Sequence, residues 1–140
     1  MVTRGLVRAA IASGVGMFAL ALTAAPAQAV EREVEFQNDC PHPVRVLVAH
    51  AYAEDSWDAH GWYEFSANEE ATQLEDNDEP LLQLDDHALF IYAESTDDSE
   101  LYWDGEEHYE TFGEVTYGMK RAVLEVVRGD LRVRLTCEGS

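Results

Sequence analysis

A succession of short apolar runs, separated by turn-forming residues, restricts the fold of this sequence more than any other feature. Residues 44–53 are a nearly unbroken apolar run rich in valine, and residues 88–94 form a second one. Leu131, Val133 and Leu135 alternate with polar residues near the C-terminus. Short runs and strict alternation are typical of β-strands, whereas a helix needs a longer stretch with a period of about 3.6 residues. We therefore predict an all-β fold, a small antiparallel β-sandwich of about seven to nine short strands.

Residues 119–127 fit two patterns. Their apolar positions match helical spacing, but they also alternate, and valine favours strands. Gly129-Asp130 supplies a tight turn directly afterwards, and residues 131–137 alternate cleanly. A hairpin explains the whole segment, so we predict strand rather than helix.

Large aromatic rings gather in two segments, residues 57–65 and 102–103. So many rings in a small domain are more typical of a core than of a site. The dipeptide Asp104-Gly105 predicts a hairpin in which residues 108–112 pair back on 101–103. Should the rings form a ligand surface instead, the residues that would line it are Trp57, His60, Trp62, Tyr63 and Trp103.

The first 29 residues differ from the rest of the chain. Arg4 and Arg8 precede an almost wholly apolar stretch, residues 9–22, and Ala27-Gln28-Ala29 is a small-x-small cleavage pattern. These features predict a secretory signal peptide over residues 1–29. The alternative is a membrane anchor, but the apolar stretch is short for a membrane span. After cleavage we expect a single β domain, residues 30–140, that is periplasmic or secreted and has no membrane association.

The mature chain is strongly acidic. It keeps seven of the nine basic residues and all 28 acidic ones, so its net charge is 7 − 28 = −21 on 140 − 29 = 111 residues. Between Arg45 and Lys120 there is no lysine or arginine. Such a surface repels nucleic acid and anionic lipid, so we expect neither as a partner. The acidity fits a solvated secreted surface; the alternative is a surface that binds cations or a basic envelope or extracellular protein.

Cys40 and Cys137 are the two cysteines of the chain. An exported chain folds in an oxidising compartment, so an even pair near opposite ends predicts a disulfide bond. Two lone cysteines without CxxC spacing are poor zinc ligands.

Four short motifs follow one another along the chain: Asn38-Asp39-Cys40 before a valine-rich run, Gly61-Trp62-Tyr63, Ile91-Tyr92-Ala93-Glu94 and Trp103-Asp104-Gly105. Together they resemble the DUF1036 family, small exported bacterial proteins of unknown function. The resemblance implies an exported β domain and supplies no activity.

Five histidines raise the question of a metal site: His42, His50, His60, His87 and His108. None forms an HxH, HxxxH or HExxH motif. His50 lies in a buried-looking run, which indicates a core histidine. His60 and His108 adjoin the aromatic segments, so a zinc or copper site built from these two stays open as an alternative.

Calcium is the ion that the abundant carboxylates favour, because it prefers oxygen ligands. The candidate ligands are Asp76 and Asp78 in one polar segment and Asp97 and Asp98 in another. Neither segment matches the twelve-residue calcium loop, so we expect at most a weak site and no other cofactor.

Catalytic motifs are absent: no serine or cysteine has a recognisable nucleophile context, and there is no phosphate loop or dinucleotide motif. We therefore expect a monomeric, non-enzymatic binding or interaction domain. The alternatives are a calcium- or ligand-binding module with an acidic rim, and a small hydrolase that would use paired carboxylates.

Overall fold

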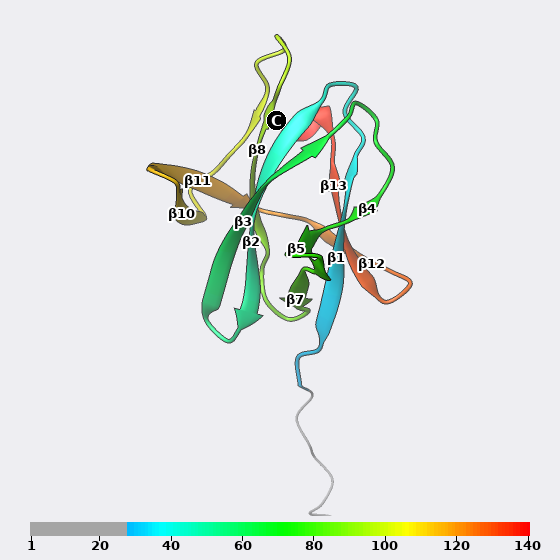
Figure 1. Cartoon of the computed structure of the whole chain (residues 1–140), viewed down its shortest axis with the longest axis vertical. Helices are drawn as coiled ribbons and strands as arrows, with labels where there is room; N and C mark the ends of the chain where they lie inside the picture. The colour runs from blue at the N-terminus through cyan, green and yellow to red at the C-terminus, as the bar shows by residue number, and fades with distance from the viewer. Residues whose placement is uncertain (1–27) are drawn as a thin grey trace, which may run out of the picture.

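A computed structural model describes residues 28–140, which form two facing β-sheets and a small separate hairpin (Figure 1). The predicted signal peptide, residues 1–29, lies outside the described residues except for its last two positions. Within the described part, four of the thirteen strands have only two residues, which leaves 13 − 4 = 9 longer strands. The predicted all-β fold is confirmed. No helix in residues 28–140 is long and apolar enough to cross a membrane.

Each sheet has a main path of paired strands and one additional strand. The first sheet runs β12 (Leu124–Val127), β13 (Asp130–Leu135), β1 (Glu31–Asn38) and β4 (Thr72–Gln73), and β7 (Leu82–Leu84) also pairs with β1. The second runs β10 (His108–Phe112), β11 (Val115–Arg121), β8 (Phe90–Ser95), β2 (Val44–Ala53) and β3 (Ser56–Phe65), and β9 (Tyr102–Trp103) also pairs with β8. The separate hairpin joins β5 (Glu75–Asp76) to β6 (Glu79–Pro80), and a short 3-10 helix, η2 (Cys137–Gly139), follows β13.

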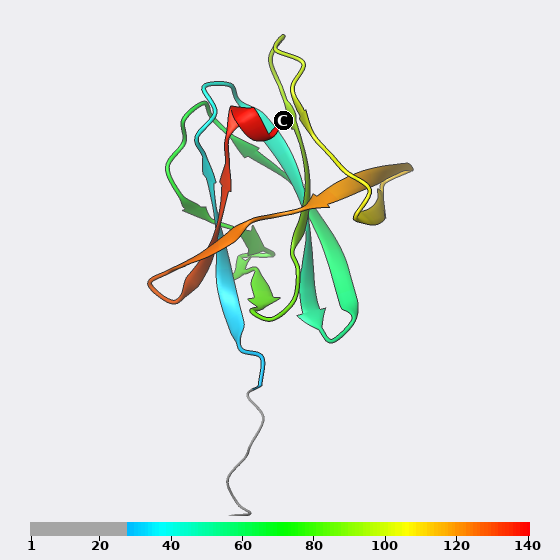
Figure 2. The ribbon, with the colours of Figure 1, turned by 180° about the vertical axis from the view of Figure 1, so that it is seen from behind.

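The two ends of the described chain lie side by side. β1 pairs with β13 in parallel, which is the one departure from the predicted antiparallel pairing within residues 28–140 (Figure 2). Cys40 follows β1 and Cys137 follows β13, so the parallel pairing brings both cysteines to the same end of the sheet. They form a disulfide bond with their Cα atoms 4.9 Å apart, and the predicted disulfide is thereby confirmed.

Strand β2 is buried on both faces, as its unbroken apolar run predicts. Val46 and Val48 face the core between the two sheets. Leu47 and Ala49 face the opposite side of the sheet, where a smaller apolar cluster lies. We call the first group the inner core and the second the outer cluster. The two exist because successive residues of a strand point to opposite faces.

The C-terminal third of the chain folds as strands, but one predicted pairing is wrong. Residues 108–112 do not pair with 101–103: β10 pairs with β11 across a turn at Gly113, and β9 pairs with β8. The Asp104-Gly105 dipeptide therefore lies in the connection from β9 to β10, which pair with different strands and do not form a hairpin with each other. The segment 119–127 is strand, as predicted, with a break between β11 and β12.

The aromatic segments contribute to the core only in part. Phe65 and Trp103 are buried, and Trp103 is 1% exposed. Trp57 and Trp62 are half-buried, and Tyr102 is 52% exposed. The prediction that these rings are mainly core therefore holds for the rings on the inner side of the sheet and fails for Tyr102.

Candidate functional site

A β-bulge in β3 shapes the candidate site. The register between β2 and β3 shifts by one residue, so that Gly61 and Trp62 together stand opposite Leu47. Gly61 has φ +155°, and a Cβ atom there would lie 2.8 Å from the Val46 carbonyl oxygen. A side chain would collide with backbone, so this position requires glycine.

The bulge decides which side chains share a face. His60 pairs with Val48, and Tyr63 pairs with Val46, so both follow the inner-core side of β2. Trp62 packs instead in the outer cluster. In a regular strand, residues 60 and 62 would point the same way. The extra residue separates His60 from Trp62 and turns His60 toward the gap between the sheets.

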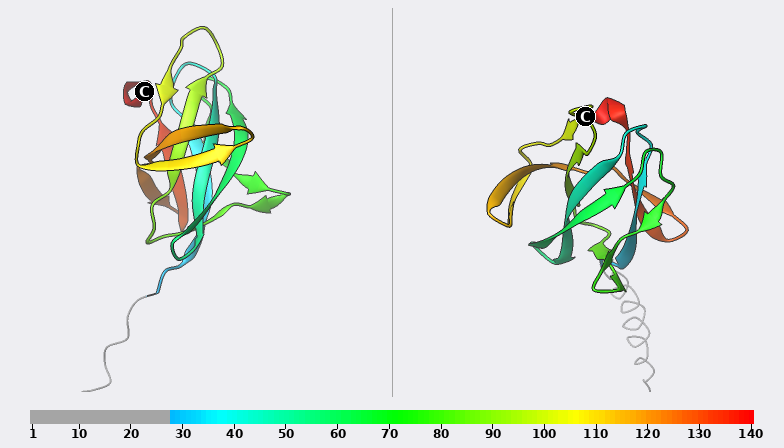
Figure 3. Two further views of the ribbon diagram at one scale, coloured as in Figure 1. Left: turned by 90° about the vertical axis from the view of Figure 1, so that its left-hand side faces the viewer. Right: turned by 45° about the horizontal axis from the view of Figure 1, so that its top comes forward.

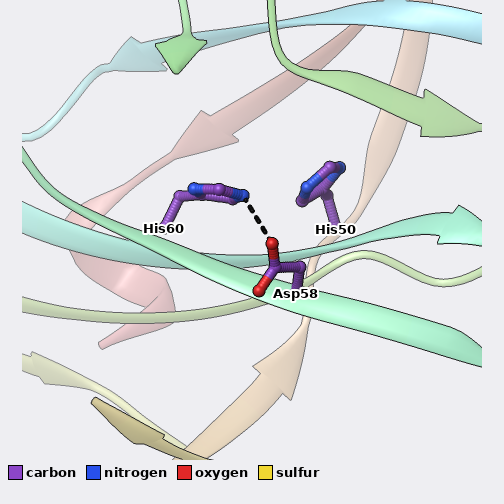
Figure 4. A group of neighbouring side chains, drawn as sticks. All are labelled: His50, Asp58 and His60. Carbon is purple, nitrogen blue, oxygen red and sulfur yellow. Dashed lines mark ion pairs between the residues drawn. The ribbon is translucent and has the colours of Figure 1, made fainter. Parts of the chain in front are cut away.

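Three potential metal ligands meet at this end of the inner face. His50 on β2 stands directly opposite Asp58 on β3, and His60 is two residues further along the same strand. By the two-residue period of strands, all three side chains lie on one face. Figure 4 shows the two imidazole rings approaching each other with the Asp58 carboxylate beside them.

The spacing of the three groups suits a transition metal ion. One ligand atom from each of His50, Asp58 and His60 lies within 4.8 Å of the others. His60 Nε2 is 3.2 Å from Asp58 Oδ2, and the ring centroids of the two histidines are 4.9 Å apart. Ligands that surround zinc at 2.0–2.1 Å in a tetrahedron are about 3.3 Å apart. The Asp58–His60 pair already has this separation, and the His50 ligand atom lies within 4.8 Å of both.

The surroundings of His50 prepare it as a neutral ligand. The ring is 7% exposed, and its Nδ1–H donates to the Leu82 carbonyl oxygen of β7. This bond fixes the tautomer, since a nitrogen that donates carries the proton and leaves Nε2 with a free lone pair. Burial lowers the pKa of His50 below its ordinary value, against the raising effect of that carbonyl bond. A metal binds the neutral imidazole, so the fixed tautomer and the net lowering of the pKa both favour coordination.

His60 has an oxygen partner on its second ring nitrogen as well. Its Nδ1 lies 3.5 Å from Asp76 Oδ1 of the β5–β6 hairpin. Both histidines thus direct one nitrogen toward an oxygen of a different strand. Metal-binding histidines almost always have this arrangement, with a carbonyl or carboxylate on the nitrogen that faces away from the ion.

A recess of about 210 Å³ gives access to the site. His50, His60 and Asp76 line it, and two more acids, Glu31 and Glu79, do so as well. The other lining residues are Tyr52, Pro80, Leu81 and Leu82. Three carboxylates in one recess attract cations and raise their local concentration.

The five residues of the predicted ligand surface do not share one face. Trp57 and Trp62 belong to the outer cluster, whereas Tyr63 and Trp103 pack on the inner core. Nor do His60 and His108 come together: His60 contacts His50, while His108 stacks on Phe90 with ring centroids 4.6 Å apart. The structure therefore does not bring together the two histidines of the alternative zinc or copper site.

The predicted calcium ligands lie on two separate segments. Asp76 and Asp78 are on the β5–β6 hairpin, and Asp97 and Asp98 are in the connection from β8 to β9. Hydrogen bonds from Ser99 and from His42 lower the pKa of Asp97 to about 2. Of these four residues, Asp76 is the one beside the histidines. The calcium site itself stays a prediction.

Sequence reasoning missed the pairing of His50 with Asp58. The signal was present: a turn at Glu54-Asp55 between two strands places residue 50 opposite residue 58. Treating His50 as a core histidine was correct for its burial and its hydrogen bond. That interpretation did not consider Nε2, the ring nitrogen that the hydrogen bond to Leu82 leaves available.

Comparisons with family models, curated proteins and solved structures found no match to the chain. The resemblance to the DUF1036 family stays a prediction.

Proposed function

We propose that this protein is a non-enzymatic, exported binding domain that takes one divalent transition metal ion at His50, Asp58 and His60. The observation that carries the proposal is the convergence of two imidazoles and a carboxylate within 4.8 Å. Two nitrogen donors favour zinc, copper or nickel over calcium and magnesium, which prefer oxygen alone. Three protein ligands leave one coordination position for water or a second molecule.

The extracytoplasmic location belongs to the same proposal. The predicted signal peptide, the DUF1036-like motifs and the disulfide bond all fit a periplasmic or secreted protein. We propose that it acts there as a monomer and that its partner is a cation, with an envelope or extracellular protein as the alternative.

Calorimetric titration of the purified protein with zinc chloride tests the proposal. We expect one equivalent of zinc to bind, and calcium at the same concentration to bind far more weakly. His60→Gln and Asp58→Asn should each weaken zinc binding by at least about tenfold, because each removes one of three ligands. His42→Gln is the matched control, since it removes a histidine paired with Asp97 on another loop. Absence of zinc, copper and nickel binding, or equal affinity in the His60 and His42 variants, would overturn the proposal.

A further inference from the structure

The β5–β6 hairpin is an exposed acidic arm that reaches the metal-ligating residues. It leaves the fold between Leu74 and Leu81, which are both 2% exposed and joined by a hydrogen bond from Leu81 N to Leu74 O. All four strand residues of the hairpin are exposed. Its six residues, 75–80, include four acids, so they repel one another at neutral pH.

Few interactions fix this arm to the rest of the protein. The Tyr63 hydroxyl donates to the Glu75 carbonyl oxygen at 3.0 Å. Asp76 reaches His60 Nδ1 at 3.5 Å, which is longer than the 2.7–2.9 Å of a charge-assisted hydrogen bond. The arm therefore approaches the site without a close bond to it.

A metal ion on His60 Nε2 changes that contact. The ion withdraws electron density from the ring, so the Nδ1–H becomes a stronger donor toward Asp76. The added positive charge also relieves the repulsion among the acids of the arm. Both effects pull Asp76 toward the ring, while its carboxylate makes the imidazole a better ligand.

We propose that Asp76 is the positioning residue of the metal site and that metal binding orders the β5–β6 hairpin. This inference rests on the proposed function. The two effects are linked: if docked Asp76 raises the metal affinity by some factor, bound metal favours docking by the same factor. Loss of a carboxylate partner behind a metal-binding histidine typically costs 10–100-fold in affinity. The docking of the arm should therefore strengthen by about 10- to 100-fold when metal binds.

Asp78→Asn provides a matched control for Asp76→Asn. Both changes remove one charge from the same hairpin. Asp78 occupies the turn with φ +67°, a conformation that asparagine tolerates well, and its side chain makes no ion pair within the described residues. A difference between the two variants therefore reports the contact with His60 and not the overall charge of the arm.

Hydrogen–deuterium exchange of peptides covering residues 74–81, with and without zinc, is the decisive experiment, combined with zinc titrations. We expect zinc to slow exchange by about 10- to 100-fold in the wild-type protein and in Asp78→Asn, and hardly at all in Asp76→Asn. Asp76→Asn should bind zinc about 10- to 100-fold more weakly than Asp78→Asn. If zinc binds but exchange does not change, or if the two variants behave alike, the inference is wrong while the metal site stands. If zinc binds none of the proteins, the proposed function itself fails, and the inference fails with it.

Discussion

The two faces of the six-stranded sheet are covered in different ways. The other sheet covers the inner face, and the side chains between them are mostly valine, leucine and alanine, with Phe36 stacked on Phe65 at 4.4 Å between ring centroids. The outer face of β3, β2 and β8 is covered by the β10–β11 hairpin of the same sheet, which lies across these strands (Figure 3, left). There the buried residues are few, and half-buried aromatic rings make up most of the cluster: Trp57, Trp62, Phe90, Tyr92, Phe112 and Tyr117.

The difference shows how one small chain covers two faces of a sheet. The other sheet buries many aliphatic side chains, whereas the outer cluster has three buried residues, Leu47, Ala49 and Met119. Wide rings cover more area per residue, and their polar tips can stay in contact with water. The Tyr92 hydroxyl donates to Glu94 Oε1 at 3.0 Å, and the Arg45 guanidinium lies 4.0 Å above the Trp62 ring. The outer cluster is therefore held by rings and charges together, whereas the inner core combines buried apolar side chains with the Cys40–Cys137 disulfide.

Removing the disulfide is the largest expected perturbation of the inner side. It closes a loop of 137 − 40 + 1 = 98 residues, and in the chain-entropy model such a loop contributes roughly 4 to 5 kcal/mol. We expect the Cys40→Ala/Cys137→Ala double variant to lose about that much free energy of unfolding in urea titrations. Wild-type protein treated with a reducing agent should show a similar loss. An unchanged urea midpoint in both would contradict the idea that the bond constrains the unfolded chain.

Matched tryptophan truncations test the contrast between the two faces directly. Trp103 is 1% exposed on the inner side, and its indole N–H donates to the Thr136 carbonyl oxygen. Trp103→Ala should cost about 3 to 5 kcal/mol through the cavity and the unpaired carbonyl. Trp62 is half-buried, so its ring has less buried apolar area to lose than that of Trp103. Trp62→Ala should therefore cost roughly half as much, about 1 to 2 kcal/mol. Equal losses in thermal or urea unfolding would mean that the hairpin seals the outer face as well as a sheet does.

The inner side is also the part that the sequence predicted best. The strands 44–53 and 131–137 and the disulfide follow from apolar period, turn residues and cysteine count. The strand signals are local in the sequence. The disulfide is predictable because each of the two cysteines has no alternative partner. The parallel pairing of β1 with β13 is a long-range contact, and nothing in either strand specifies which neighbour it takes.

The candidate site escaped prediction for a different reason. A single extra residue at Gly61 reverses the face on which everything before it lies. A regular two-residue period would put His60 on the same face as Trp62, and the bulge separates them. A glycine within a strand does signal a bulge, but its register appears only once the partner strand is known. The turn at Glu54-Asp55 does indicate that His50 lies opposite Asp58. Asp76 comes from a third strand, and no spacing within the 50–60 segment could reveal that it meets them.

The smallest expected effect concerns the charges of the outer cluster. Arg45 pairs with Glu94 at 3.1 Å and lies over Trp62, and its side chain is partly exposed. Arg45→Met keeps most of the aliphatic stem and removes the charge, so it isolates the electrostatic part of these contacts. A cation–π contact at such a site contributes about 0.5 to 1 kcal/mol and an exposed ion pair somewhat less, so we expect a loss of about 1 kcal/mol.

The Arg45→Met variant also makes the net charge more negative by one. Removing any positive side chain has this effect and destabilises an acidic protein. Arg121→Met controls for this, because it makes the same change of charge at an exposed residue whose side chain has no ion pair within residues 28–140. Salt separates the two contributions, since the Debye length falls from about 30 Å at 0.01 M to about 8 Å at 0.15 M. Thermal unfolding should show the Arg121→Met effect disappearing as salt is added, while the excess loss in Arg45→Met persists because its partners are in contact. If the two variants instead lose stability equally at every salt concentration, Arg45 acts only through net charge, and the outer cluster is held by its rings alone.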